Sequence, residues 1–198
     1  MPSDWSQDLY IQAYRFAAQA HWEKHQLVPG TRIPYLMHFT LVAMEIVAAL
    51  AVEPSLDGNL SVQCALLHDT LEDTDTNYED LVHHFGAQVA DGVAALTKDA
   101  SIAADAKAPW QRKSLQMADS LKRIKKQPKE IWMVKLADRI TNLQPPPHDW
   151  TQDKVRRYKQ EAIDIHASLK DSSIFLSDRL KDKISTYRYL MDKGTTNA

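Results

Sequence analysis

The sequence predicts an all-α fold, a bundle of helices built as one domain. Apolar residues recur at a spacing near 3.6 in successive segments, and proline or glycine separates these segments. Only 5 glycines are present, which leaves few tight hairpins for a β-sheet. With 198 residues, 44% of them hydrophobic, the chain can bury one sizeable core. We expect a single domain over residues 1–198, with its core at about 20–170 and a frayed tail at 193–198.

The order of the helices follows from the apolar periodicity and from the prolines and glycines that interrupt it. Pro29, Gly30 and Pro34 make 26–34 a loop, Gly86 ends a short helix, and three prolines at 145–147 interrupt the chain near its last third. The weak apolar pattern of 97–109 predicts a mobile loop. Helices are expected over residues 4–24, 35–51, 59–68 with a polar extension to 76, 78–85, 87–96, 110–127, 129–143, 151–170 and 177–192.

Composition excludes several classes of function. The formal net charge of −2 gives no basic surface for nucleic acid or an anionic membrane. No apolar run approaches the roughly 18 residues of a spanning helix, and the N-terminal residues lack a signal peptide pattern. The single cysteine, Cys64, lies in an apolar run, so we expect a core thiol in a cytoplasmic protein without disulfides.

An unusual cluster of ionisable groups follows the apolar residues of segment 64–76. His68, Asp69, Glu72 and Asp73 occur within six positions. On a continuous helix, His68 would lie one turn before Glu72, and Asp69 one turn before Asp73, so all four would share one face. Buried carboxylates are costly unless paired, and a divalent cation is the simplest partner. The pattern predicts two metal ligands followed by two carboxylates that act on a water molecule.

Two other apolar helices each carry one such polar group. His38 interrupts 35–51, where a lone histidine is more often a core residue than a ligand. Asp138 lies in the middle of 129–143, and the adjacent Arg139 faces another direction on the helix. Asp138 therefore needs a partner from elsewhere. Nitrogen and oxygen ligands without thiolate suit manganese, iron, cobalt or zinc.

The order His, His-Asp, Asp on helices resembles the HD phosphohydrolase superfamily, whose members are all-helical. Within it, residues 20–167 closely resemble the hydrolase domain of RelA/SpoT-type alarmone enzymes and the small alarmone hydrolases. The motifs that carry the resemblance are PYLMH, LLHDTLEDTDT and VKLADRITNL. It implies removal of the 3′-pyrophosphate of guanosine tetra- and pentaphosphate (ppGpp and pppGpp), usually with Mn²⁺.

The resemblance also implies a role for each matched residue. Asn142 would contact the nucleotide, and Lys154 and Tyr158 would face its phosphates and ribose. Lys24 and Arg32 are further basic candidates for neutralising the leaving pyrophosphate. The expected metal ligands are His38, His68, Asp69 and Asp138, and the residues expected to orient or deprotonate water are Glu72 and Asp73.

Departures from the family pattern leave the base open. Many members carry an Arg-Lys pair before the Pro-Tyr-x-x-His segment, and here that stretch lacks the pair. Phe39 also stands where proline commonly follows the histidine. Adenosine alarmones (ppApp) and the 2′-phosphate of NADPH are therefore alternative substrates. A nucleotide sensor and a helical bundle with internal ion pairs are alternatives of another class. The sequence leaves monomer and homodimer open.

Overall fold

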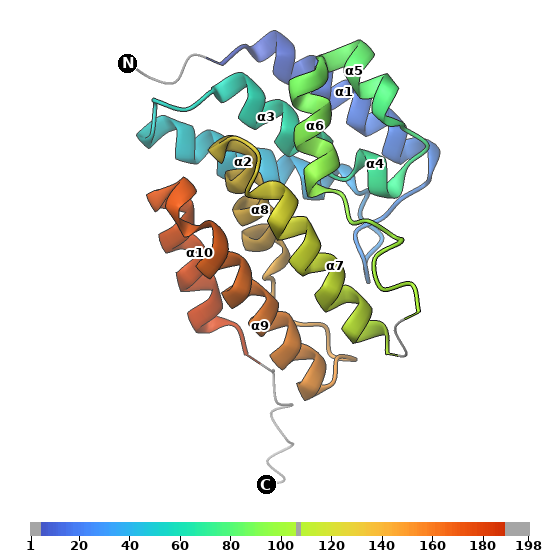
Figure 1. Cartoon of the computed structure of the whole chain (residues 1–198), viewed down its shortest axis with the longest axis vertical. Helices are drawn as coiled ribbons and strands as arrows, with labels where there is room; N and C mark the ends of the chain where they lie inside the picture. The colour runs from blue at the N-terminus through green and yellow to red at the C-terminus, as the bar shows by residue number, and fades with distance from the viewer. Residues whose placement is uncertain (1–4, 106–107, 189–198) are drawn as a thin grey trace, which may run out of the picture.

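The computed structural model describes residues 5–105 and 108–188 (Figure 1). No strand occurs within these ranges, and Leu27 and Pro34 form an isolated bridge. The predicted all-α class is therefore confirmed. The helices are α1 Gln7–Glu23, α2 Leu36–Val52, α3 Gly58–Leu67, α4 Thr70–Asp73, α5 Tyr78–Phe85, α6 Ala87–Leu96, α7 Pro109–Ile124, α8 Lys129–Asn142, α9 Gln152–Leu169, the 3₁₀ turn η1 Lys170–Ser172 and α10 Ile174–Thr186.

Side chains cap the helices where the sequence changes from turn to helix. Asn77 accepts a hydrogen bond from the backbone N–H of Asp80, and Asp80 accepts one from that of Asn77, which makes a capping box for α5. Gly86 ends α5 at φ 85°, a conformation that favours glycine. Thr151 caps α9 by accepting from the N–H of Lys154. These local signals explain why the predicted helix starts and stops lie close to the observed ones.

Helices α3 and α8 form the centre of the core. Every residue of α3 except Asn59 is buried, and α8 is buried from Glu130 through Thr141 except for Trp132. Helix α2 packs against both α3 and α8. In Figure 1, α7, α9 and α10 run together below this centre, while α1, α5 and α6 cover it above. The predicted metal ligands thus lie on α2 and α8 and at the end of α3, three helices that pack against one another.

The structure corrects several element boundaries, among them the end of the helix expected over 110–127, which is Ile124. The polar extension of the third helix is broken, because α3 ends at Leu67 and α4 begins at Thr70. The last helix begins at Ile174 and not at 177, and it ends at Thr186 because Tyr187 is extended. Residues 189–192 of the expected helix lie outside the described residues. Helix α7 starts at Pro109, one residue before the expected start. The expected tail at 193–198 and part of the expected loop, 106–107, lie outside the described residues.

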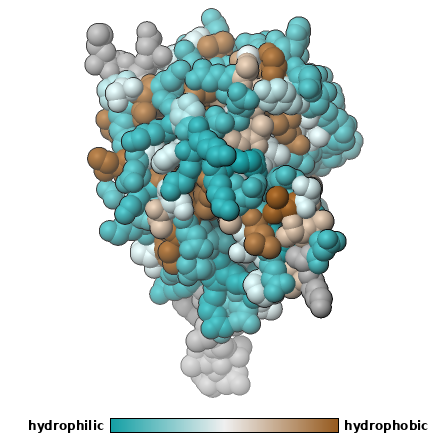
Figure 2. Space-filling model, in the orientation of Figure 1, coloured by the Kyte–Doolittle hydropathy of each residue, from teal (hydrophilic) through white to brown (hydrophobic). Residues whose placement is uncertain are grey.

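The surface gives no sign of a membrane span. Within the described residues, no helix has both the length and the apolar character needed to cross a bilayer. Figure 2 shows a largely hydrophilic face on which apolar groups are scattered. Cys64 lies in the core, where burial raises the pKa of its thiol and makes it unreactive.

Candidate metal and phosphohydrolase site

The predicted ligands meet where three core helices end or bend. His38 lies in the first turn of α2, His68 and Asp69 form the break between α3 and α4, and Asp138 lies near the end of α8. The Nε2 atoms of His38 and His68 are 3.3 Å apart. Asp69 Oδ2 lies 2.8 Å from Nε2 of His68 and 3.6 Å from that of His38. Asp138 Oδ1 lies 3.5 Å from Nε2 of His38.

Hydrogen bonds fix the orientation of this group. His68 Nδ1 lies 2.9 Å from the carbonyl oxygen of Ala65, so Nδ1 carries the proton and Nε2 faces the cluster. The Tyr35 hydroxyl donates to Asp69 Oδ2. Asp138 accepts from Lys135 Nζ at 2.9 Å and from the Asn142 amide. Three of the four predicted ligands, His68, Asp69 and Asp138, are thus held by neighbouring groups.

The electrostatics of the cluster favour positive charge. Burial alone would lower the pKa of His68, but the neighbouring Asp69 and Asp138 carboxylates raise it to about 9. Burial likewise opposes ionisation of Asp69, yet His68 lowers the pKa of this carboxyl below its usual range. For Asp138 the opposing charge comes first from Lys135, and its pKa is also lowered. Two ionised carboxylates therefore face two imidazole nitrogens at a buried point.

This donor set fits a divalent metal. Donor atoms of His38, His68 and Asp69 all lie within 4.8 Å of one another, and Asp138 Oδ1 is 3.9 Å from His68 Nε2. The Nε2 atoms of His38 and His68 are within hydrogen-bonding distance of each other, so both rings direct a nitrogen to the same point beside the two carboxylates. Imidazole and carboxylate together suit borderline and hard divalent ions. These are the nitrogen and oxygen donor types from which a metal site is predicted in the sequence.

The two following carboxylates lie on α4, beside the ligands. Glu72 accepts from Lys98 Nζ at 2.6 Å and from the Lys98 backbone N–H at 3.2 Å. Asp73 Oδ2 accepts from Gln26 Nε2 at 2.9 Å. Partial burial raises the pKa of Asp73, and the bond from Gln26 offsets part of that rise. Each carboxylate is thus held by a residue from another part of the chain.

A cavity of about 470 Å³ opens over the ligands and these carboxylates. Its volume suits a small molecule such as a nucleotide. Four cationic side chains line it, namely Lys98, Lys113, Lys135 and Arg139. The remaining lining residues are Tyr35, His68, Asp69, Glu72, Asp73, Leu96, Gln116, Met117, Asp138, Asn142, Tyr158 and Glu161.

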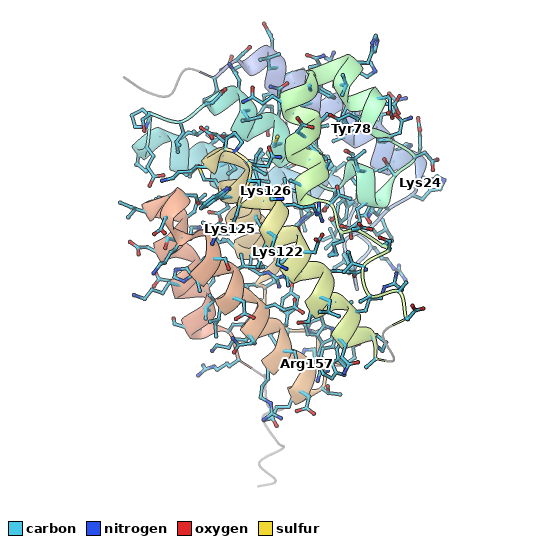
Figure 3. All side chains as sticks on the ribbon, in the orientation of Figure 1. Lys24, Tyr78, Lys122, Lys125, Lys126 and Arg157 are labelled. Carbon is cyan, nitrogen blue, oxygen red and sulfur yellow. The ribbon has the colours of Figure 1, made fainter. Side chains whose placement is uncertain are left out.

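The structure separates the predicted substrate residues into two groups. Asn142 and Tyr158 line the cavity. Lys154 does not, and its Nζ lies 4.1 Å from the centre of the Trp150 ring. Lys24, at the end of α1, forms an exposed ion pair with Asp75. Figure 3 shows Lys24 at the edge of the molecule. Arg32 is exposed in the loop between α1 and α2 and is not a lining residue.

Sequence reasoning did not identify several lining residues. Lys98 and Lys113 belong to a loop and to an amphipathic helix whose local patterns carry no sign of a site. Arg139 follows Asp138 in the VKLADRITNL motif, yet it faces the cavity beside the Tyr158 ring, 4.6 Å from its centroid. By contrast, Lys122, Lys125 and Lys126 are exposed at the end of α7, as expected of a solvated face (Figure 3).

Comparisons with known proteins identify the family of the chain. The model of a family described as HD domain matches residues 13–172. The guanosine-3′,5′-bis(diphosphate) 3′-pyrophosphohydrolase MESH1 of Xenopus tropicalis is 30% identical and is aligned over 87% of this chain and 90% of its own. The human MESH1 protein is 32% identical over 86% and 90% of the two chains.

A solved structure gives the same result for the fold. It is described as a metazoan ortholog of SpoT that hydrolyzes ppGpp, and it superposes with a TM-score of 0.70 at 26% identity. The match covers 92% of this chain and 97% of the other. Family model, sequence relatives and structural neighbour all include the segments that carry the cluster. The chain belongs to the HD-domain family.

Proposed function

We propose that this protein hydrolyses guanosine alarmones, converting ppGpp and pppGpp to GDP and GTP with release of the 3′-pyrophosphate. The observation that carries the proposal is that three predicted metal ligands, His68, Asp69 and Asp138, line one cavity with two further carboxylates and four cations. The fourth predicted ligand, His38, lies behind them, with its Nε2 3.3 Å from that of His68. The names of the MESH1 relatives and the ppGpp activity given for the structural neighbour support the same substrate.

The proposed cofactor is a divalent cation, Mn²⁺ in the first place, held by His38, His68, Asp69 and Asp138. The imidazole nitrogens and carboxylate oxygens of these residues are ligands that such an ion accepts. When bound, the ion supplies positive charge at the phosphoryl oxygens and makes a water molecule more acidic. Among the described residues no thiol reaches the site, and Cys64 is buried elsewhere.

Glu72 and Asp73 are the proposed groups that orient and deprotonate water. The oxygen of water attacks the phosphorus attached to O3′ of the ribose, the P–O3′ bond breaks, and O3′ receives a proton. Both carboxylates line the same cavity as His68, Asp69 and Asp138, so a water molecule in that cavity is open to them. The raised pKa of Asp73 suits a group that accepts a proton and releases it again.

Four cations and five carboxylates line the cavity. Three of the cations are ion-paired there: Lys98 with Glu72, Lys135 with Asp138, and Arg139 with Glu161. Lys98, Lys113, Lys135 and Arg139 surround a space next to the ligands, so a pyrophosphate group can be neutralised there as it leaves. Asn142 and Tyr158, on α8 and α9, are the proposed contacts to the nucleoside part. Lys154, Lys24 and Arg32 lie outside the lining and stay candidates for the outer phosphates.

The proposal includes the organisation of the chain. We infer that residues 1–198 form one hydrolase domain, because the buried core includes residues from α1 through α10. A small-molecule substrate and no nucleic-acid partner follow from the enclosed cavity and the net charge of −2. A cytoplasmic location is supported by the single, buried cysteine. The protein would act as a monomer or homodimer.

An adenosine alarmone is the second candidate substrate. The segment between α1 and α2 lacks the Arg-Lys pair that many related enzymes carry, and its Gln26 side chain is bound to Asp73. A base contact from this segment would therefore need another residue. The same feature keeps NADPH as a third substrate to examine.

The test is turnover of ppGpp, ppApp and NADPH, side by side, with added Mn²⁺ and with products separated by anion-exchange chromatography. Release of pyrophosphate from ppGpp supports the proposal. Release from ppApp alone would mean that the substrate carries adenine and not guanine. Release of neither, from protein with its metal bound, contradicts alarmone hydrolysis and favours another nucleotide phosphatase or a sensor.

A further inference from the structure

Gln26 connects the end of α1 to the carboxylate of Asp73. Its Nε2 donates to Asp73 Oδ2 at 2.9 Å, and its Oε1 lies 2.5 Å from Nδ1 of His21. A carboxylate only accepts, so the amide nitrogen must face Asp73 and the amide oxygen must face His21. The proton on this side of the imidazole is therefore on Nδ1. The three side chains form a chain of hydrogen bonds with one direction.

Packing holds the His21 ring in place at one end of these hydrogen bonds. Its side chain is buried, and its ring lies 4.9 Å from that of Tyr35 and stacks at 5.7 Å on Phe39. Burial lowers the pKa of His21, which keeps the ring neutral with a single N–H. Nε2 has no hydrogen-bond partner within the described part of the chain. That one N–H is committed to Gln26.

The backbone around Gln26 is held just as firmly. His25 has φ 50°, a left-handed conformation that a residue with a side chain rarely adopts. Such a conformation costs about 1–3 kcal/mol and persists only where the surroundings fix it. Here the Gln26 N–H donates to the His21 carbonyl at 3.2 Å, and the Gln26 carbonyl accepts from the Tyr35 N–H at 3.0 Å. The turn at His25 thus directs the Gln26 side chain toward α4.

We propose that Gln26 is a positioning residue for Asp73. Its side-chain amide sets the orientation of the Asp73 carboxylate toward the attacking water. This inference rests on the proposed function, in which Asp73 acts on that water. With Oδ2 fixed by Gln26, Oδ1 is the oxygen that acts. Catalytic side chains must be held within about 0.5 Å of their working geometry, and a misplacement of about 1 Å can cost on the order of 100-fold in rate.

Two substitutions and a control separate positioning from packing. Gln26→Leu removes both side-chain hydrogen bonds. Gln26→Glu keeps the size and the acceptor for His21 but places an acceptor against Asp73, so a mere packing role would tolerate it. Thr31→Val is the matched control, because Thr31 Oγ1 donates to the Val28 carbonyl at 2.9 Å within the same loop. Thr31 is not a lining residue of the cavity.

The expected result is a fall in kcat of roughly 10- to 100-fold for both Gln26 variants, with KM and metal content little changed. Thr31→Val should keep wild-type kcat. Wild-type kcat in Gln26→Glu, an equal loss in Thr31→Val, or a rise in KM alone would each overturn the positioning role. An inactive wild-type protein would instead contradict the proposed function, and the positioning role of Gln26 in catalysis with it.

A second readout needs no turnover. In NMR spectra, the side-chain amide protons of Gln26 should shift when Asp73→Ala removes their acceptor, and should stay unchanged in Thr31→Val. Unchanged Gln26 amide signals in Asp73→Ala would show that the contact is absent and would overturn the inference by themselves.

Discussion

Lys98 binds Glu72 through two separate groups, its ammonium at 2.6 Å and its backbone N–H at 3.2 Å. The residue follows the end of α6 and so joins the loop after that helix to α4. Burial would lower the pKa of Lys98, but the Glu72 carboxylate raises it, so the lysine stays charged. Glu72 is thereby held at the cavity wall beside a cation that also lines it.

Replacing Lys98 by alanine should reduce kcat/KM for ppGpp by about 10-fold or more, because the change removes a positive charge from the cavity and releases the Glu72 side chain. The fall in thermal stability should be small, since the pair is partly exposed. Steady-state kinetics measure the effect. Lys122→Ala, which removes an exposed lysine outside the cavity, is the control and should leave kcat/KM unchanged. Equal kinetics for both variants would remove Lys98 from the site.

Glu72→Gln should separate catalysis from metal binding. The amide cannot accept a proton from water, so kcat should fall by roughly 100-fold or more. Glu72 is held by Lys98 and is not one of the four proposed ligands, so the metal content of the purified protein should stay at the wild-type level. Metal analysis by mass spectrometry together with kcat makes the comparison. A loss of metal in this variant would mean that Glu72 is a ligand.

Arg179→Ala should destabilise the fold without a direct effect on the site. Arg179 on α10 forms two hydrogen bonds with Glu45, a buried carboxylate of α2. Leaving a buried charge unpaired costs 3–5 kcal/mol, and partial exposure of Arg179 reduces this to about 1–2 kcal/mol. The melting temperature should fall by roughly 2–8 °C.

The control for that change is an ion pair at the surface. Arg156→Ala breaks the exposed pair with Asp153 and should leave the melting temperature within about 1 °C of wild type. Differential scanning calorimetry compares the two variants. If both variants melt together, the α2–α10 ion pair contributes nothing to stability.

The helices were predictable because their signals are local. Apolar periodicity, the Asn77 turn and Gly86 each act within a few residues, and the observed helices agree with them. The break at His68 and Asp69 was not predicted, since both residues keep helical φ and ψ angles and nothing in their identity marks an interruption. At this break between α3 and α4, the Tyr35 hydroxyl donates a hydrogen bond to Asp69.

The site was predictable only where its residues stand out from their surroundings. His38, His68, Asp69 and Asp138 are polar groups in apolar helices, and the structure brings them to one place. Lysines in polar segments have no such contrast, so the lining role of Lys98 and Lys113 depends on tertiary packing. Gln26 is equally inconspicuous in the sequence. The basic residues Lys24 and Arg32 were nominated for charge alone, and the structure places them outside the lining.

Phe39 shows how a departure from the family pattern is accommodated. In place of the common proline, its ring is fully buried and contacts Tyr14 and His21 of α1. It packs beside the His21 end of the hydrogen-bond chain to Asp73. The Phe39 side chain therefore packs α2 against α1 and does not line the cavity.

The most direct test of the central claim compares wild-type protein with Asp69→Ala in Mn²⁺ content and in release of pyrophosphate from ppGpp. Asp69 Oδ2 lies 2.8 Å from His68 Nε2 and 3.6 Å from His38 Nε2, so its loss should remove the metal and abolish hydrolysis. Wild-type protein should bind Mn²⁺ and release pyrophosphate with GDP as the second product. Pyrophosphate release by Asp69→Ala at the wild-type rate would contradict a metal-dependent mechanism at this cluster.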